Sequence, residues 1–120
     1  MRAKTNDTTS VRGREAEERA ARHLAGCGLR LVDRNFRIRG GEIDLICRDG
    51  ASLVFVEVRQ RSRSDFGGAG ASITAAKRQR IILAARHYLL GKADCDCRFD
   101  CVLIDGERME WVKDAFAADD

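Results

Sequence analysis

Apolar residues recur at helical spacing in two parts of the chain. Residues 11–26 carry an apolar residue at every fourth position, and residues 72–90 show a second, longer helical pattern. The repeating positions of the first segment are Ala16, Ala20 and Leu24. Glu17 lies beside this stripe rather than opposite it, so its carboxylate either flanks the buried face or points inward. The pattern predicts two helices, each packing one face against the rest of the protein.

Other segments alternate apolar and polar residues, as half-buried strands do. They are residues 29–39, 42–48, 53–61 and 98–105, with residues 109–112 as a short edge strand. Asp49-Gly50 is typical of a tight hairpin turn, and it lies between the predicted strands at residues 42–48 and 53–61. A right-handed crossover through the second helix would lay the fourth strand parallel to the third. The predicted fold class is therefore α/β, with the order α-β-β-β-α-β, a mixed sheet and flanking helices.

The chain length limits the number of domains. At 120 residues, of which 44% are apolar, the sequence can form one core but not two. We expect a single domain over residues 11–115, between disordered tails at residues 1–10 and 116–120. No apolar run approaches the ~20 residues that span a bilayer. The polar first ten residues lack the apolar stretch of a signal peptide, so a cytoplasmic protein without membrane association is expected.

The charge is unevenly distributed. Residues 1–90 contain 18 Lys and Arg against 10 Asp and Glu, a net charge of +8, whereas residues 91–120 contain 4 against 9, a net charge of −5. Arginine accounts for 18 of the 22 basic residues, and its guanidinium group binds phosphate through two donors. A basic body favours a polyanionic partner such as nucleic acid, although a solvated surface explains the same charge equally well.

The predicted hairpin brings two carboxylates together. If residues 49–52 form its loop, Asp44 lies directly opposite Glu57; with a two-residue Asp-Gly loop, Asp44 instead faces Phe55 and Glu57 is its diagonal neighbour. Either register places Asp44 and Glu57 on one face of the sheet. Arg59 follows two residues later, on that same face. The hairpin therefore predicts an acidic pair with a cation beside it.

Two carboxylates this close need a neighbour that balances their charge, because otherwise the pKa of one of them rises. A bound Mg²⁺, which prefers oxygen ligands and retains water molecules, would balance the pair and activate a water molecule for attack on a phosphodiester. A ladder of salt bridges to Arg39, Arg48 or Arg59 on a solvent-exposed face is the alternative. The residues alone leave both interpretations open.

Several motifs resemble the YraN family of uncharacterised bacterial proteins. The resemblance spans roughly residues 11–105 and is most specific in two blocks, Gly41-Glu42-Ile43-Asp44-Leu45-Ile46 and Val54-Phe55-Val56-Glu57-Val58-Arg59. Further matching motifs are Gly13-x3-Glu17-x2-Ala20, Arg34-Asn35-Phe36-Arg37, Phe66-Gly67, Lys77-Arg78-Gln79-Arg80 and Arg98-Phe99-Asp100. This family is similar to Holliday-junction resolvases and other nucleases, which implies a restriction-endonuclease-like core for this chain.

The resemblance also implies roles for individual residues. It assigns Asp44 as the central metal-binding aspartate, Glu57 as the second metal-binding carboxylate, and Glu17 as the acidic residue that completes the cluster. Arg59 stands where the nuclease motif usually has lysine, and arginine stabilises phosphate charge but does not readily deprotonate. Lys77 on the second helix is a candidate substitute for that amine, and an exposed lysine or a phosphate contact explains it as well.

Basic side chains elsewhere are candidates for contact with nucleic acid. They are Arg39, Arg61, Arg63, Lys77, Arg78 and Arg80. The glycine-rich loop at residues 62–70 is a candidate to close over a substrate. Asp100 fits a strand-end cap as well as a site residue, and Trp111 is better explained as a packing residue at the sheet edge.

These features predict an endonuclease that uses Mg²⁺ or Mn²⁺ to hydrolyse phosphodiester bonds of DNA. Asp44 and Glu57 would hold the metal, Glu17 would assist, and Arg59 would stabilise the developing charge. The similarity to resolvases implies a branched substrate and a homodimer. Two alternatives stay open: a non-catalytic nucleic-acid-binding module of the same fold, and a protein-interaction subunit whose acidic face is structural.

Overall fold

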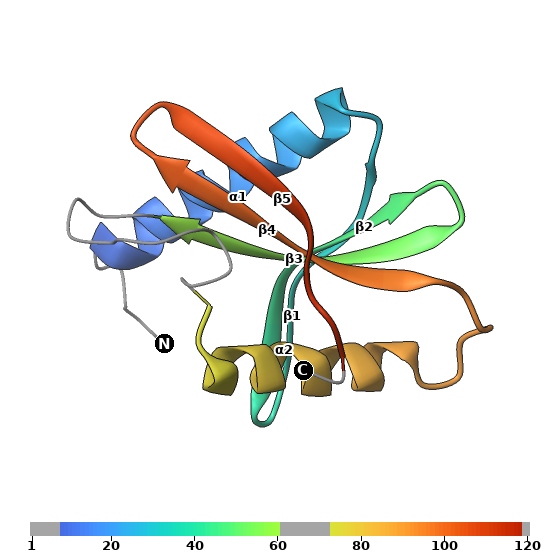
Figure 1. Cartoon of the computed structure of the whole chain (residues 1–120). Helices are drawn as coiled ribbons and strands as arrows, with labels where there is room; N and C mark the ends of the chain where they lie inside the picture. The colour runs from blue at the N-terminus through green and yellow to red at the C-terminus, as the bar shows by residue number, and fades with distance from the viewer. Residues whose placement is uncertain (1–7, 61–72, 119–120) are drawn as a thin grey trace.

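The computed structural model describes residues 8–60 and 73–118, which form two helices and a five-stranded sheet (Figure 1). In chain order the elements are α1 (Thr8–Gly26), β1 (Arg30–Ile38), β2 (Gly41–Asp49), β3 (Ser52–Gln60), α2 (Ala75–Leu89), β4 (Cys97–Asp105) and β5 (Arg108–Phe116). The predicted α/β class and the order of elements are confirmed. Neither described helix is both long enough and apolar enough to cross a membrane.

The sheet is mixed, and its strands lie in chain order from β1 to β5. Three neighbouring pairs are antiparallel, whereas β3 and β4 are parallel. The parallel pair confirms the predicted crossover through α2. β5 extends from Arg108 to Phe116 and is longer than the predicted strand at residues 109–112. A shift of register between Phe99 and Cys101 accommodates the extra length beside β4.

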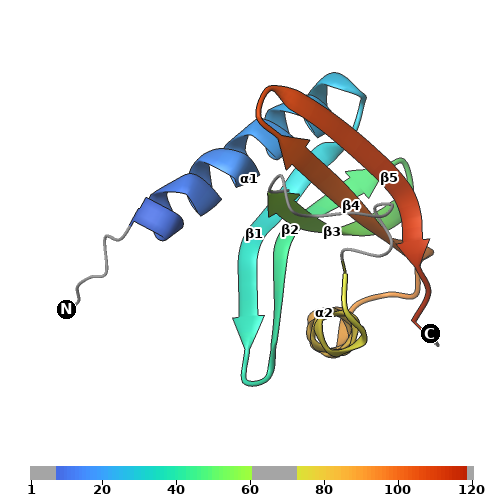
Figure 2. The ribbon, with the colours of Figure 1, turned by 60° about the vertical axis from the view of Figure 1, so that its left-hand side comes forward.

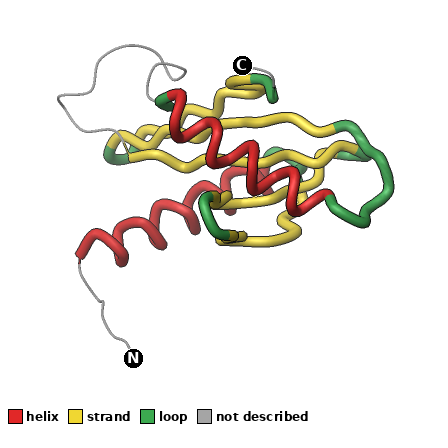
Figure 3. The backbone as a smooth tube through the Cα atoms, turned by 90° about the horizontal axis from the view of Figure 1, so that it is seen from below, coloured by secondary structure: helices red, strands yellow, loops and turns green. Residues whose placement is uncertain are grey.

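The two helices lie on opposite faces of the sheet (Figures 1 and 3). Alternate residues of β3 divide between the two cores, as strand geometry requires. Leu53 and Phe55 pack under α2, and Val54 and Val56 pack under α1. Glu57 and Arg59 continue the series that faces α2. The predicted alternation along this strand is therefore confirmed, and it aims both side chains toward one layer.

The ends of the chain are more ordered than the sequence suggested. α1 begins at Thr8, so residues 8–10, which we expected in the N-terminal tail, are helical. Phe116, expected to begin the C-terminal tail, is the last residue of β5; it is buried and stacks on Phe99 with ring centroids 4.9 Å apart. Burial of an aromatic ring stabilises the strand end that carries it. Residues 1–7 and 119–120 lie outside the described residues.

The β1–β2 hairpin rests directly on α2. A Cβ atom at Gly41 would lie 2.5 Å from the carbonyl oxygen of Arg80 and 3.1 Å from the amide nitrogen of Ala84. Only glycine allows the two backbones to approach this closely. Gly40 precedes it in the turn with φ of +86°, a conformation that other residues rarely adopt. The Gly40-Gly41 pair therefore makes the turn and also seats the hairpin against the helix.

Candidate active site

The hairpin between β2 and β3 has the first of the two registers considered. Leu45 pairs with Val56 and Arg48 with Leu53, and continuing this register by one residue places Asp44 opposite Glu57. The ladder ends at the Leu45–Val56 pair. Ile43 and Ile46 are three residues apart, yet both pack under α2, so β2 twists at Asp44. The acidic pair lies at the point where β2 leaves β3.

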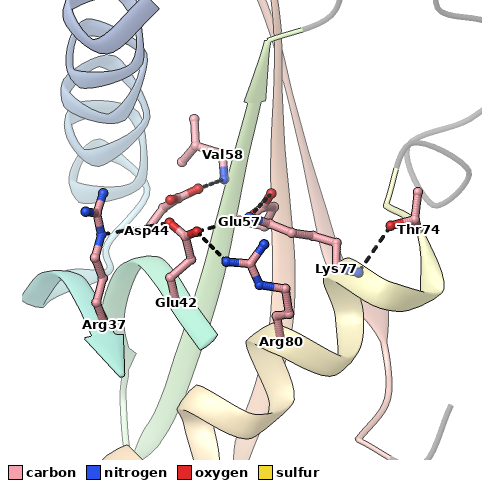
Figure 4. A network of polar contacts seen from close by, with 8 residues as sticks. All are labelled: Arg37, Glu42, Asp44, Glu57, Val58, Thr74, Lys77 and Arg80. Atoms are coloured by element: carbon pink, nitrogen blue, oxygen red, sulfur yellow. Dashed lines mark hydrogen bonds and ion pairs between the residues drawn. The ribbon is translucent and has the colours of Figure 1, made fainter. Parts of the chain in front are cut away.

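Asp44 is tied to β3 by its side chain instead of its backbone. The amide nitrogen of Val58 donates a hydrogen bond of 2.9 Å to Oδ2 of Asp44 (Figure 4). Burial raises the pKa of the Asp44 carboxyl, and the Val58 hydrogen bond opposes that rise by stabilising the charged form. The bond fixes one carboxylate oxygen and leaves the other directed into the site.

Glu57 is a buried acid without a full set of partners. Its side chain is 4% exposed, and within the described part of the chain its Oε1 atom has no hydrogen-bond donor. Burial, and after it the negative charge of Asp44, raise the pKa of Glu57 to about 8. Because this value lies above 7, Asp44 and Glu57 together hold a proton near neutral pH.

Lys77 provides a positive charge next to this pair. Its Nζ atom lies 3.8 Å from Oε2 of Glu57 and 3.8 Å from Oε1 of Glu42 (Figure 4). Thr74 caps α2 by accepting a hydrogen bond from the Lys77 amide nitrogen, which places this lysine in the first turn of the helix. A cation there opposes the helix dipole. The two carboxylates offset that cost, so the site explains a lysine at this position.

Glu42 gathers the remaining cations of the site. It accepts a hydrogen bond of 3.2 Å from Nη2 of Arg80 and lies 3.9 Å from Nε of Arg37. Glu42 is thus a partner of arginines from α2 and β1. The alternative of an arginine ladder over Asp44 and Glu57 is not what the described ion pairs show, because the cation in contact with Glu57 is Lys77.

Glu17 reaches the same region from α1. Burial raises the pKa of Glu17, and the negative charge of Asp44 raises it as well. A hydrogen bond from the Asn35 side chain lowers it. Of the two orientations considered for Glu17, its partial burial and its interaction with the charge of Asp44 favour the inward one. Glu17 of α1 is thus near enough to Asp44 of β2 for their charges to interact.

Asn35 is a site residue that the sequence analysis missed. It has φ of +48°, one of two non-glycine residues with positive φ in the described ranges. Arg34 pairs with Leu45 and Phe36 with Ile43, so Asn35 lies opposite Asp44. Asparagine tolerates this left-handed conformation better than most residues do. Its place in the Arg34–Arg37 motif was the signal available, since an asparagine within a strand is uncommon.

The remaining basic candidates differ in whether they face the acidic pair. Arg59 is partly buried on the same face of β3 as Glu57, and its charge lowers the pKa of that acid, as the predicted common face requires. Arg78 points elsewhere: its Nε donates to the carbonyl oxygen of Ile73, and its guanidinium lies 5.9 Å from the ring centroid of Phe116. Arg39 is exposed in the β1–β2 turn. The predicted contacts at Arg61, Arg63 and the residue 62–70 loop lie outside the described residues.

Asp100 belongs to a different network. It is fully buried and accepts hydrogen bonds from Nε of Arg98, Nε1 of Trp111 and the amide nitrogen of Asp114. Arg98 also lies 3.0 Å from Oδ2 of Asp49 at the end of β2. Of the two roles considered for Asp100, these contacts favour the structural one. The network ties β5 and the β2–β3 turn to the edge of β4.

The donor set suits a hard divalent cation. Within residues 8–60 and 73–118 no group of three or more His, Cys, Asp and Glu side chains is arranged to hold a metal. Mg²⁺, however, is commonly bound by one or two carboxylates together with substrate phosphates and water. Asp44 and Glu57 offer two carboxylates, and Oε1 of Glu57 has no donor among the residues that the structure describes.

The fold and the site define a mixed α/β protein in which two neighbouring strands bring together a partly buried aspartate and a buried glutamate. Comparison with known proteins places it more narrowly: residues 16–104 match the uncharacterised protein family UPF0102. A UPF0102 protein of Dechloromonas aromatica is 81% identical over all 120 residues of both chains. A UPF0102 protein of Cupriavidus taiwanensis is 58% identical over 112 residues, covering 91% of this chain and 85% of its own. The chain belongs to the UPF0102 family, the YraN-like family that the motifs indicated.

Proposed function

We propose that this protein is a metal-dependent endonuclease that hydrolyses phosphodiester bonds of DNA, with a restriction-endonuclease-like core. The observation that carries the proposal is the pair of partly buried Asp44 and buried Glu57, in which Oε1 of Glu57 has no donor among the described residues and Lys77 contacts the other oxygen. A purely structural acidic pair would have its oxygens satisfied by the protein. Buried acids with raised pKa values are typical of sites that act on a ligand.

Asp44 and Glu57 would hold Mg²⁺ or Mn²⁺, with Glu17 nearby to bind its coordinated water. The bound cation would lower the pKa of a water molecule and stabilise negative charge on the phosphate. The hydrogen bond from Val58 orients Asp44, and burial between β3 and α2 orients Glu57. The protein thus fixes both carboxylates before a substrate arrives.

In this proposal Lys77 and Arg59 each take one role of the lysine that the nuclease motif usually carries. Arg59 stays charged, so it stabilises the phosphate as the reaction adds negative charge to it. Lys77 places its amine 3.8 Å from Glu57, where it would orient the attacking water or give a proton to the leaving group of a phosphate bound at this acid. We assign the electrostatic role to Arg59 and the proton-handling role to Lys77.

A non-catalytic nucleic-acid-binding module is the second candidate, and the arginine at position 59 favours it. If the lysine at that position is indispensable for turnover, the chain binds DNA without cutting it. Arg59→Lys separates the two functions. Strong activation by this substitution would support the binding module, whereas unchanged or lower cleavage supports the division of roles between Arg59 and Lys77.

A cleavage assay tests the proposal. Single-stranded, duplex, flapped and four-way DNA are incubated with the protein and Mn²⁺ or Mg²⁺, beside Asp44→Asn and Glu57→Gln. Asp33→Asn is the matched control, since this exposed aspartate of β1 accepts a hydrogen bond only from the neighbouring Arg34 amide among the contacts described. We expect metal-dependent products that both site variants reduce by about 10²-fold or more and the control leaves unchanged. No metal-dependent product on any of the substrates would refute the enzyme.

A further inference from the structure

The β1–β2 turn extends past α2 and carries positive charge to the margin of the acidic site. Figure 2 shows the hairpin as a long arm beside α2, with its turn beyond the helix. Arg37 is near the end of β1 and Arg39 is in the turn itself. The close backbone contact at Gly41 holds this arm against Arg80 of α2. Arg37 and Arg80 border the site through Glu42, and Arg39 lies two residues beyond Arg37 in the turn; we call Arg37, Arg39 and Arg80 the basic rim.

The basic rim is open to solvent. The side chains of Arg37 and Arg80 are 71% and 52% exposed, and Arg39 is exposed. Among the described residues Arg39 has no ion pair. Exposed arginines retain most of their donors for a ligand even when one donor contacts a carboxylate. The rim can therefore bind a second partner without breaking the fold.

The acids at the margin do not neutralise the rim. Glu42 is the one carboxylate in contact with Arg37 and Arg80 in the described structure, and it also contacts Lys77. Its contact with Arg37 is long, at 3.9 Å. The single negative charge of Glu42 is thus shared among three positive side chains. The excess of positive charge lies on the margin, while the acids Asp44 and Glu57 lie further in, beside the cation Lys77.

We propose that the basic rim binds the phosphate backbone of DNA and directs one phosphodiester toward Asp44 and Glu57. This inference rests on the proposed function for its ligand, but binding by the rim requires neither metal nor turnover. Guanidinium groups bind phosphate oxygens through paired donors, and a helix-anchored hairpin presents them without loss of loop entropy. The rim offsets the repulsion between phosphates and the acidic interior.

The test is the binding of a short fluorescent DNA duplex by the full chain in EDTA, followed by anisotropy. For the double variant Arg37→Ala/Arg39→Ala we expect affinity about tenfold or more below wild type, and a salt slope between ~50 and ~200 mM that is smaller by about 1.8, because each phosphate contact contributes about 0.9. The matched control is Arg22→Ala/Arg86→Ala. It removes two exposed arginines from α1 and the last turn of α2, and Arg86 lies about 9 Å along the helix axis from Arg80.

Equal loss of affinity in both double variants, or none in the rim variant, would overturn the inference, as would a wild-type chain that does not bind duplex DNA. Lysine at both rim positions should restore most of the affinity, because the positive charge returns. Thermal melting of each variant verifies that it is folded. The two proposals fail separately. If DNA binding depends on the rim but no metal-dependent cleavage occurs, the proposed nuclease activity is refuted and the proposed role of the rim stands. If cleavage does not depend on Arg37 and Arg39, only the proposed role of the rim is refuted.

Discussion

Nζ of Lys77 lies 3.8 Å from Oε2 of Glu57, a carboxylate that is 4% exposed and whose other oxygen has no donor in the described structure. An ammonium group at this distance reduces the cost of burying the negative charge without satisfying it fully. The contact joins the first turn of α2 to the middle of the sheet. It connects the stability of the fold with the chemistry of the site.

Replacing Lys77 should therefore change both properties. We expect Lys77→Met to reduce cleavage by about 10²-fold or more, since the amine near the reacting phosphate is lost. Lys77→Arg keeps the charge, so its melting temperature should stay near that of wild type while its cleavage stays low. Cleavage rates and thermal melts of both variants measure this. Full activity in Lys77→Arg would show that only the positive charge matters.

The raised pKa of Glu57 makes stability depend on pH. The folded protein holds a proton that the unfolded chain releases near its ordinary pKa of 4.5, and it keeps that proton up to about pH 8. The stability that protonated Glu57 contributes is thus fully present below pH 4.5, and it is lost as the pH rises from there to about 8. We expect wild type to lose a few kcal/mol between about pH 5 and pH 8.5 relative to Glu57→Gln. Denaturant unfolding at both pH values measures the difference, and parallel pH profiles would contradict it.

Gly41 should be irreplaceable for packing reasons. Gly41→Ala places a methyl group against the backbone of Arg80 and Ala84, which cannot rotate away as a side chain can. We expect a loss of about 1–3 kcal/mol in the free energy of unfolding. Gly13→Ala is the comparison, since a Cβ there meets nothing within 4 Å and alanine favours the helix. Chemical denaturation of both variants decides the point; equal stability of Gly41→Ala and wild type would show that the hairpin is not seated on α2.

We predict that Asn35 affects metal binding through its side-chain hydrogen bond to Glu17, and not through its own backbone conformation. Asn35→Gly keeps the left-handed conformation, whereas Asn35→Ala strains it by about 1 kcal/mol. Both variants remove the hydrogen bond to Glu17. We expect Asn35→Gly to melt near wild type, yet to share with Asn35→Ala a weaker affinity for Mn²⁺. If only the alanine variant is impaired, the role of Asn35 is confined to the turn of the strand.

The part of the site built by one hairpin was predictable from the sequence. The turn at Gly50 and Ala51, between the paired Asp49 and Ser52, fixes the register, and side-chain alternation then places Asp44 and Glu57 on one face. The single crossover likewise fixes β4 parallel to β3. These features follow from local turn chemistry and the strand repeat, which a sequence displays directly.

The contacts between elements were not predictable. Lys77 and Arg78 are neighbours in sequence, but a helix rotates successive side chains by about 100°, so Lys77 contacts Glu57 while Arg78 contacts Phe116. Which of the two faces the acids depends on how α2 packs across the sheet. Asn35 was missed because its importance comes from a backbone conformation and not from its residue type.

The central claim is that Asp44 and Glu57 together bind a divalent cation, and titration calorimetry with Mn²⁺ tests it most directly. Near pH 7 the pair holds a proton that the cation must displace. We therefore expect one Mn²⁺ per chain, release of close to one proton as judged from buffers of different ionisation enthalpy, and loss of both signals in Glu57→Gln. Absence of binding to wild type, or equal binding to the variant without any change in proton release, would contradict the account.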